Sequence, residues 1–102
     1  MTPAMPQPEN SVLFVIPGAL RELAGNRPEI RLERAAGSLL DALSRLWTEC
    51  PALRDRVMTE TGDVRPHVNI FVDGQNMRDA GGLQMPVRGG AEVFLLPAVS
   101  GG

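Results

Sequence analysis

The period of the hydrophobic pattern changes along the chain, and each change predicts a new structural element. Residues 11–16 form a compact apolar run bounded by turn-forming residues, which is typical of a strand. Residues 21–25 predict a short helical turn or loop. Residues 29–34 alternate strictly between polar and apolar, which predicts a half-buried strand with Ile30 and Leu32 facing inward.

The best helical signal starts at Ser38. Ser38 is a favourable N-cap, and Asp41 stands three residues later, in a position that resembles a capping box. The apolar residues that recur at helical spacing on one face are Leu39, Leu43, Leu46, Trp47 and Cys50. Pro51 is predicted to close this helix because its ring cannot continue the hydrogen-bond ladder. Residues 53–60 predict a second short helical piece.

The second half of the chain predicts strands separated by turns. Residues 68–72 alternate again, and Asp73-Gly74 is a tight hairpin signal that makes residues 75–78 a short partner strand. Residues 83–88 show no clear period and are predicted to be irregular. Residues 91–96 form the last strand.

The predicted order is strand, strand, helix, strand, short strand, strand. A short first connection favours an antiparallel hairpin, and the helix can act as a crossover that covers one face of the sheet. This order predicts an α+β fold, a single-domain β-grasp (ubiquitin-like) arrangement with a mixed sheet curled around one main helix. We expect residues 11–97 to form this domain, residues 1–10 to be a disordered lead, and residues 98–102 to be a flexible tail.

Strand alternation also predicts an apolar outer face. If the valines and isoleucine of residues 68–72 face the helix, Phe71 points to the open side, and the last strand presents Phe94 and Leu96 there. Exposed apolar patches often mark protein interfaces. The predicted docking residues are Phe71, Phe94, Leu96 and Pro97. A register reversed by one residue would bury them instead, although the charge of Glu92 favours the first register.

Composition excludes several classes of function. The chain has 102 residues, enough for one core, and its net charge of −2 argues against nucleic-acid binding through a basic surface. No apolar run approaches the length of a membrane span, and residues 1–10 lack the order of a signal peptide, so we expect a cytoplasmic protein with no membrane partner. All ten basic residues are Arg and none is Lys. Genomic base composition is one explanation, but in either case no side chain carries a primary amine.

No catalytic or metal-binding set is predicted. Cys50 is the only cysteine, which excludes an internal disulfide, and its place on the apolar helix face favours a core residue over a nucleophile. His67 has no accompanying nucleophile or ligand set and is predicted to be structural or on the surface. The Arg residues are interspersed with acids, which predicts solvated faces.

The chain ends in Ser100-Gly101-Gly102. Such an ending is either a frayed terminus or a thin arm that can enter a narrow slot in another protein. The five residues after Pro97 span up to about 17 Å when extended, and Pro97 is a reasonable end to sheet pairing. Val99, the one bulky tail residue, either anchors the arm in a partner groove or caps the sheet edge.

Residues 92–102, EVFLLPAVSGG, resemble the ending of the MoaD/ThiS sulfur-carrier family, which follows an E-V-x-x-x-P-x-V-x-G-G pattern. Residues 20–25, LRELAG, and residues 67–74, HVNIFVDG, with Arg78 and Gly81-Gly82-Leu83 behind them, also resemble segments of the MoaD branch. The Arg-x-x-Gly-Gly-Leu segment looks most like the CysO-type carriers of cysteine biosynthesis.

One segment departs from the family pattern. The turn before the last strand commonly reads Asp-Gly-Asp, and residues 89–91 read Gly-Gly-Ala here. We expect these lost acids to lie near the tail and to affect which partner docks.

The resemblance implies a carrier that is a substrate of enzymes and not itself an enzyme. An ATP-dependent activating enzyme would adenylate the Gly102 carboxylate, a sulfur donor would convert it to a thiocarboxylate, and an acceptor enzyme would take the sulfur. That acceptor would be cysteine-synthase-like, molybdopterin-synthase-like or thiazole-synthase-like, and an isopeptidase-type metalloprotease is a further expected partner. No cofactor would be bound. The alternatives are a ubiquitin-like modifier joined through Gly102 to target lysines, or a small subunit whose diglycine is incidental.

Overall fold

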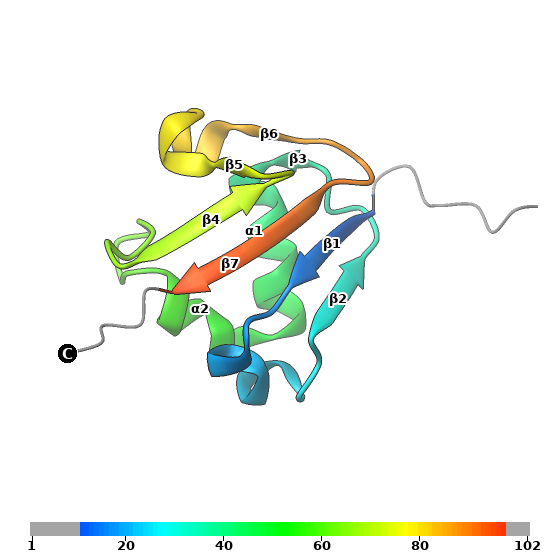
Figure 1. The fold of residues 1–102 in the computed structure, drawn as a ribbon, viewed down its shortest axis with the longest axis vertical. Coiled ribbons are helices and arrows are strands. Elements are labelled where there is room, and N and C mark those ends of the chain that lie inside the picture. The colour runs from blue at the N-terminus through cyan, green and yellow to red at the C-terminus, as the bar shows by residue number, and fades with distance from the viewer. Residues whose placement is uncertain (1–10, 98–102) are drawn as a thin grey trace, which may run out of the picture.

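The computed structural model describes residues 11–97, which form a mixed five-stranded sheet with two helices packed on one face (Figure 1). The order of strands across this sheet is β2-β1-β7-β4-β5. Its strands are β1 (Val12–Val15), β2 (Glu29–Leu32), β4 (Val68–Val72), β5 (Gln75–Asn76) and β7 (Glu92–Pro97). The predicted lead, residues 1–10, and the predicted tail, residues 98–102, lie outside the described residues.

The strand pairing confirms the predicted mixed sheet. β1 pairs with β2 as an antiparallel hairpin, as the short first connection predicts. β7 lies between β1, to which it is parallel, and β4, to which it is antiparallel. The last strand of the chain therefore occupies the middle of the sheet, where both of its edges are hydrogen-bonded.

Helix α1 (Leu39–Glu49) begins with the predicted capping box. The Ser38 hydroxyl accepts a hydrogen bond from the Asp41 N–H at 3.0 Å, and the Asp41 carboxylate accepts one from the Ser38 N–H at 3.1 Å. Gly37 has φ +145°, and a Cβ added there would lie 2.8 Å from the Asp41 carboxylate. Glycine at this position therefore leaves room for the cap.

The predicted apolar face of α1 lies against the sheet. Leu39, Leu43 and Leu46 are fully buried, whereas Trp47 is only partly buried at the margin of the core. Cys50 is 5% exposed and belongs to the core, as predicted. These side chains meet the inward-facing residues of the sheet, among which the fully buried ones are Val12, Phe14, Val68, Ile70, Val93 and Leu95.

Pro51 does more than close the first helix. It is the first residue of α2 (Pro51–Val57). A proline is tolerated at this position because the backbone N–H of the first helical residue makes no hydrogen bond within the helix. The second short helix that was predicted for residues 53–60 is present, but it spans residues 51–57. The predicted turn at residues 21–25 is the end of a longer 3₁₀ helix, η1 (Gly18–Ala24).

Two short segments differ from the sequence prediction. The hairpin at Asp73-Gly74 is present, with φ of 49° and 85°, but β5 stops at Asn76 instead of reaching Arg78. The Asn76 side chain accepts a hydrogen bond from the Arg78 N–H at 2.9 Å, which starts the 3₁₀ helix η2 (Met77–Asp79). Met77 is buried there.

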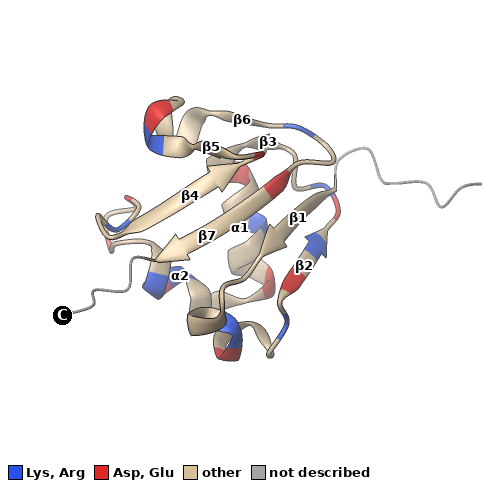
Figure 2. Cartoon of the chain, viewed as in Figure 1, with Lys and Arg blue, Asp and Glu red and all other residues tan. Residues whose placement is uncertain are grey.

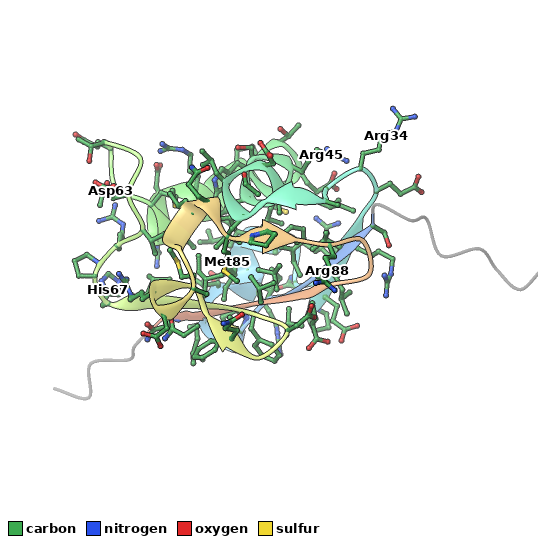
Figure 3. All side chains as sticks on the ribbon, turned by 90° about the horizontal axis from the view of Figure 1, so that it is seen from above. Arg34, Arg45, Asp63, His67, Met85 and Arg88 are labelled. Carbon is green, nitrogen blue, oxygen red and sulfur yellow. The ribbon has the colours of Figure 1, made fainter. Side chains whose placement is uncertain are left out.

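Residues 83–88 are more ordered than predicted. They include the end of the 3₁₀ helix η3 (Gly82–Gln84) and the strand β6 (Pro86–Val87), which pairs with β3 (Gly37–Ser38). The partner strand is almost fifty residues away in sequence, and a two-residue pairing has no period to detect. Met85 and Val87 are both buried in the core, and Figure 3 shows Met85 pointing into it.

Replacing Ser38 with Ala is expected to lower the free energy of unfolding by about 1 kcal/mol, because the Asp41 N–H loses its acceptor. Urea denaturation followed by circular dichroism measures this loss. Ser44→Ala is the matched control, since the Ser44 hydroxyl only bonds back to the Leu40 carbonyl within the helix. Equal stability of the Ser38 and Ser44 variants would contradict a structural role for the cap.

Candidate functional site

The outer face of the sheet carries large apolar side chains along its central strand. In β7, Val93 and Leu95 are fully buried, whereas Phe94 is 42% exposed and Leu96 is 46% exposed. Phe71 of β4 lies directly opposite Phe94 and is half-buried. The predicted register is confirmed, although the role of these residues in docking stays a prediction.

Strand β1 widens this apolar surface. Val15 lies beside Phe94 in the parallel register, and Leu13 lies beside Glu92, both half-buried. Sequence reasoning missed these two residues because the apolar run of β1 has no alternation that separates its faces. The open-face patch is defined by Leu13, Val15, Phe71, Phe94 and Leu96.

Charged residues border the open-face patch without entering its centre. Among the strands of the five-stranded sheet, Figure 2 shows charges on β2 and at the start of β7, whereas β1, β4 and the rest of β7 carry none. The residues concerned are Glu29, Arg31 and Glu92. An uncharged apolar centre within a polar rim is the usual anatomy of a protein–protein interface.

The open-face patch leads directly to the end of the described chain. Pro97 is the last residue of β7, is half-buried, and pairs with Val68 at the start of β4. Its place at the end of sheet pairing is the one predicted for it. The predicted tail residues, Val99, Ser100, Gly101 and Gly102, lie outside the described residues. We call the Pro97–Val68 pair the tail base.

The turn of residues 89–91 lies at the other end of β7 from the tail base. The Gly90 N–H donates to the Ser11 carbonyl at 2.7 Å, which fixes the turn beside the start of β1 (Figure 1). The expectation that the missing acids lie near the tail is therefore wrong, because a six-residue strand separates them from it.

Arg78 is exposed, as the sequence predicts, but its guanidinium also holds backbone carbonyl groups. Its Nη2 donates to the carbonyl oxygens of Val68 at 2.7 Å and of Arg65 at 2.9 Å. Arg65 in turn donates from Nε to the Asp55 carbonyl at 2.8 Å. Two guanidinium groups thus hold the loop before β4 in place at the tail base. The fixed, forked donors of arginine suit such backbone contacts.

The other candidate residues gain no chemistry from the fold. The buried thiol of Cys50 accepts a hydrogen bond at 3.3 Å from Nη2 of the partly buried Arg27. His67 is exposed in the loop before β4 (Figure 3). Within residues 11–97, no group of His, Cys, Asp or Glu side chains forms a potential metal site. None of the helices in that range is long and apolar enough to cross a membrane.

A shallow hollow of about 380 Å³ opens beside the β4–β5 hairpin, between Asp73 and Arg88. The Asp73 carboxylate is already used there, since it accepts a hydrogen bond from the Glu92 N–H at 2.9 Å. This bond joins the hairpin to the start of β7. The hollow therefore adds no catalytic group to the open-face patch.

Comparisons with known proteins agree with this geometry. A profile of the ThiS family matches residues 14–102. The sulfur carrier protein CysO of Mycobacterium tuberculosis is 33% identical over 95 residues, covering 90% of this chain and 99% of that protein. A candidate sulfur carrier of Archaeoglobus fulgidus is 42% identical over 48 residues, which cover 47% of this chain and 54% of that protein, about half of each.

Two further matches bear on the fold and on the range of functions. The small archaeal modifier protein 1 of Haloferax volcanii is 34% identical over 84 residues, covering 81% of this chain and 91% of that protein. A chain in the crystal structure of the Amycolatopsis orientalis BexX/CysO complex has a TM-score of 0.81 at 25% identity, covering 89% of this chain and 99% of that chain. The predicted β-grasp fold is confirmed.

Exchanging Phe94 for Ala is expected to change the free energy of unfolding by about 1 kcal/mol or less, because its side chain lies partly in solvent. Leu95→Ala is expected to cost about 2–5 kcal/mol, because it leaves a cavity in the core. Urea titrations of the two variants measure the difference. A larger loss for Phe94 than for Leu95 would show that the faces are assigned the wrong way round.

Proposed function

The chain belongs to the ThiS family, and from this premise we propose that it is a sulfur carrier whose Gly102 carboxylate is adenylated, converted to a thiocarboxylate and used as a sulfur donor. The proposal rests above all on one observation: the open-face patch lies on β7, the strand that ends at the tail base. A partner that binds this patch therefore lies close to Pro97, the last described residue before the diglycine tail.

The chemistry fits a protein that is a substrate and not an enzyme. A terminal carboxylate is anionic at neutral pH, since its ordinary pKa is about 3.5, and it is a poor electrophile. Adenylation from ATP on the activating enzyme supplies a leaving group, which a sulfur donor then replaces. The described residues offer no nucleophile–base pair or metal site for these steps. In this proposal the chain supplies the carboxylate that reacts, and its partners supply the catalysis and the ATP. We therefore expect it to act in the cytoplasm.

Two kinds of enzyme follow from this proposal. One is the activating enzyme, and the other accepts the sulfur for a cofactor, cysteine or another small metabolite. The relatedness to CysO favours a cysteine-synthase-like acceptor, while molybdopterin-synthase-like and thiazole-synthase-like enzymes remain alternatives. The similar chain in the BexX/CysO complex was crystallised with a second protein, which supports stable docking of such a carrier. An isopeptidase-type metalloprotease is a further candidate partner.

The alternative function is a ubiquitin-like modifier joined through Gly102 to lysines of target proteins. The similarity to a small archaeal modifier favours it, and both functions begin with the same adenylate. Mass spectrometry of the protein from its native cell distinguishes them. A mass gain equal to replacing one oxygen with sulfur supports the carrier, whereas branched Gly101-Gly102 remnants on target lysines support the modifier. Absence of both, with the cognate activating enzyme present, would reject both.

Deleting Gly102, or adding residues after it, is expected to abolish sulfur loading by the cognate activating enzyme, because the reacting carboxylate is displaced. The thiocarboxylate mass measures loading, and circular dichroism checks that the fold is intact. The matched control is an addition before residue 11, at the other end of the chain. Retained loading in the tail variants would contradict the proposal.

Phe94→Asp is expected to weaken binding to the activating or acceptor enzyme by about 2 kcal/mol or more, which is roughly 30-fold in Kd, because it places a charge at the centre of the open-face patch. Isothermal titration calorimetry measures the change. Leu40→Asp is the control, since Leu40 is similarly exposed, at 39%, but lies on α1 across the sheet. Equal weakening by both variants would refute docking through this face.

A further inference from the structure

The loop before β4 closes as a single turn next to the tail base. The Val68 N–H donates to the Arg65 carbonyl at 3.0 Å, which closes residues 65–68 into a four-residue turn. The last residue of this turn, Val68, pairs with Pro97, and the two residues at its centre are exposed. We call residues 65–68 the tail-base turn.

One guanidinium group holds the carbonyl groups of this turn. Arg78 Nη2 lies 2.7 Å from the Val68 oxygen, 2.9 Å from the Arg65 oxygen and 3.5 Å from the Pro66 oxygen. Carbonyl oxygens that converge on one point repel one another, because each carries a partial negative charge, and a shared cation offsets this repulsion. The conformation of the tail-base turn therefore depends on the charge of Arg78.

The backbone of Arg78 is fixed by a separate segment of the fold. The Arg78 N–H donates to the Asn76 side chain at 2.9 Å at the start of η2, and the neighbouring Met77 is buried. From this anchored position the side chain reaches back to carbonyl groups that are ten or more residues away in sequence. Arg78 thus joins the end of the β4–β5 hairpin to the tail-base turn.

The tail-base turn adjoins both Pro97 and the open-face patch. Pro97 pairs with Val68, and Leu96 of the patch pairs with Asn69, the next residue of β4. Paired strands lie about 5 Å apart, so the turn is within reach of any protein that covers these residues. Figure 3 shows His67 at the end of the molecule where β7 ends. An enzyme that binds the open-face patch and acts on the chain end therefore meets this turn.

We propose that Arg78 is a positioning residue for docking, which holds the tail-base turn in the conformation that the activating enzyme contacts. This inference rests on the proposed activation of Gly102 and deepens it, because it adds a second contact region beside the open-face patch. In this role Arg78 acts through the backbone of the turn, while the exposed His67 supplies part of the surface that the enzyme meets.

The test measures ATP–pyrophosphate exchange by the cognate activating enzyme at increasing concentrations of the full-length chain. R78M keeps a long side chain but removes its charge and its donors. We expect R78M to raise the KM for the chain by about tenfold and to leave kcat within about twofold, because docking is lost and the chemistry is not. R78K retains a cation with three donors and is expected to recover part of the loss.

The matched control for R78M is R34M, because Figure 3 shows Arg34 at the opposite end of the molecule from His67. R34M is expected to retain the native KM. Circular dichroism and urea denaturation check that each variant is folded at the assay temperature. A purely structural role for Arg78 would lower the free energy of unfolding but leave the KM of the folded chain unchanged.

A second variant tests the contact itself. His67 is exposed, so H67D changes the surface of the tail-base turn without removing a core side chain. We expect H67D to raise KM by about fivefold or more with kcat retained, since the changed group binds the enzyme and takes no part in the reaction.

Three outcomes would overturn the inference: a native KM for folded R78M, a native KM for H67D, or an equal rise in KM for R34M and R78M. Failure of the proposed function gives a different result. In that case the native chain itself supports no pyrophosphate exchange, and the inference is rejected together with the activation on which it rests.

Discussion

The structure depends on the pairing of its last strand with its first. β7 lies between β1 and β4, so the strand that comes last in the described sequence is the central strand of the sheet. Val93 and Leu95 are fully buried on one side of it. This central place anchors β7 in the core and fixes the position of Pro97, its last residue.

The two faces of β7 separate stability from recognition. Alternate side chains of a strand point to opposite sides, so Phe94 and Leu96 are outside because Val93 and Leu95 are inside. A change on the outer face can alter binding while the core stays packed. The apolar side of α1 closes the inner face, and only the outer face stays open to a partner.

Much of the fold could be predicted from local pattern. The capping box at Ser38, the hairpin at Asp73-Gly74 and the alternation of residues 68–72 are each set by neighbours within a few residues. The β3–β6 pairing could not be predicted, since two residues carry no period and their partners are remote. The contacts of Arg78 were missed for a similar reason, because its carbonyl acceptors are ten or more residues away in sequence.

The sequence by itself determined the element order, the two faces of β4 and β7, the absence of lysine and the diglycine ending, because each is a property of composition or of short-range period. Only the tertiary structure decided which segments that are distant in the sequence lie next to one another. It placed Leu13 and Val15 of β1 beside β7, put the turn of residues 89–91 at the far end of β7 from the tail base, and set the Arg78 guanidinium against the Val68 carbonyl. These neighbours meet through strand pairing between distant segments, which no local pattern encodes.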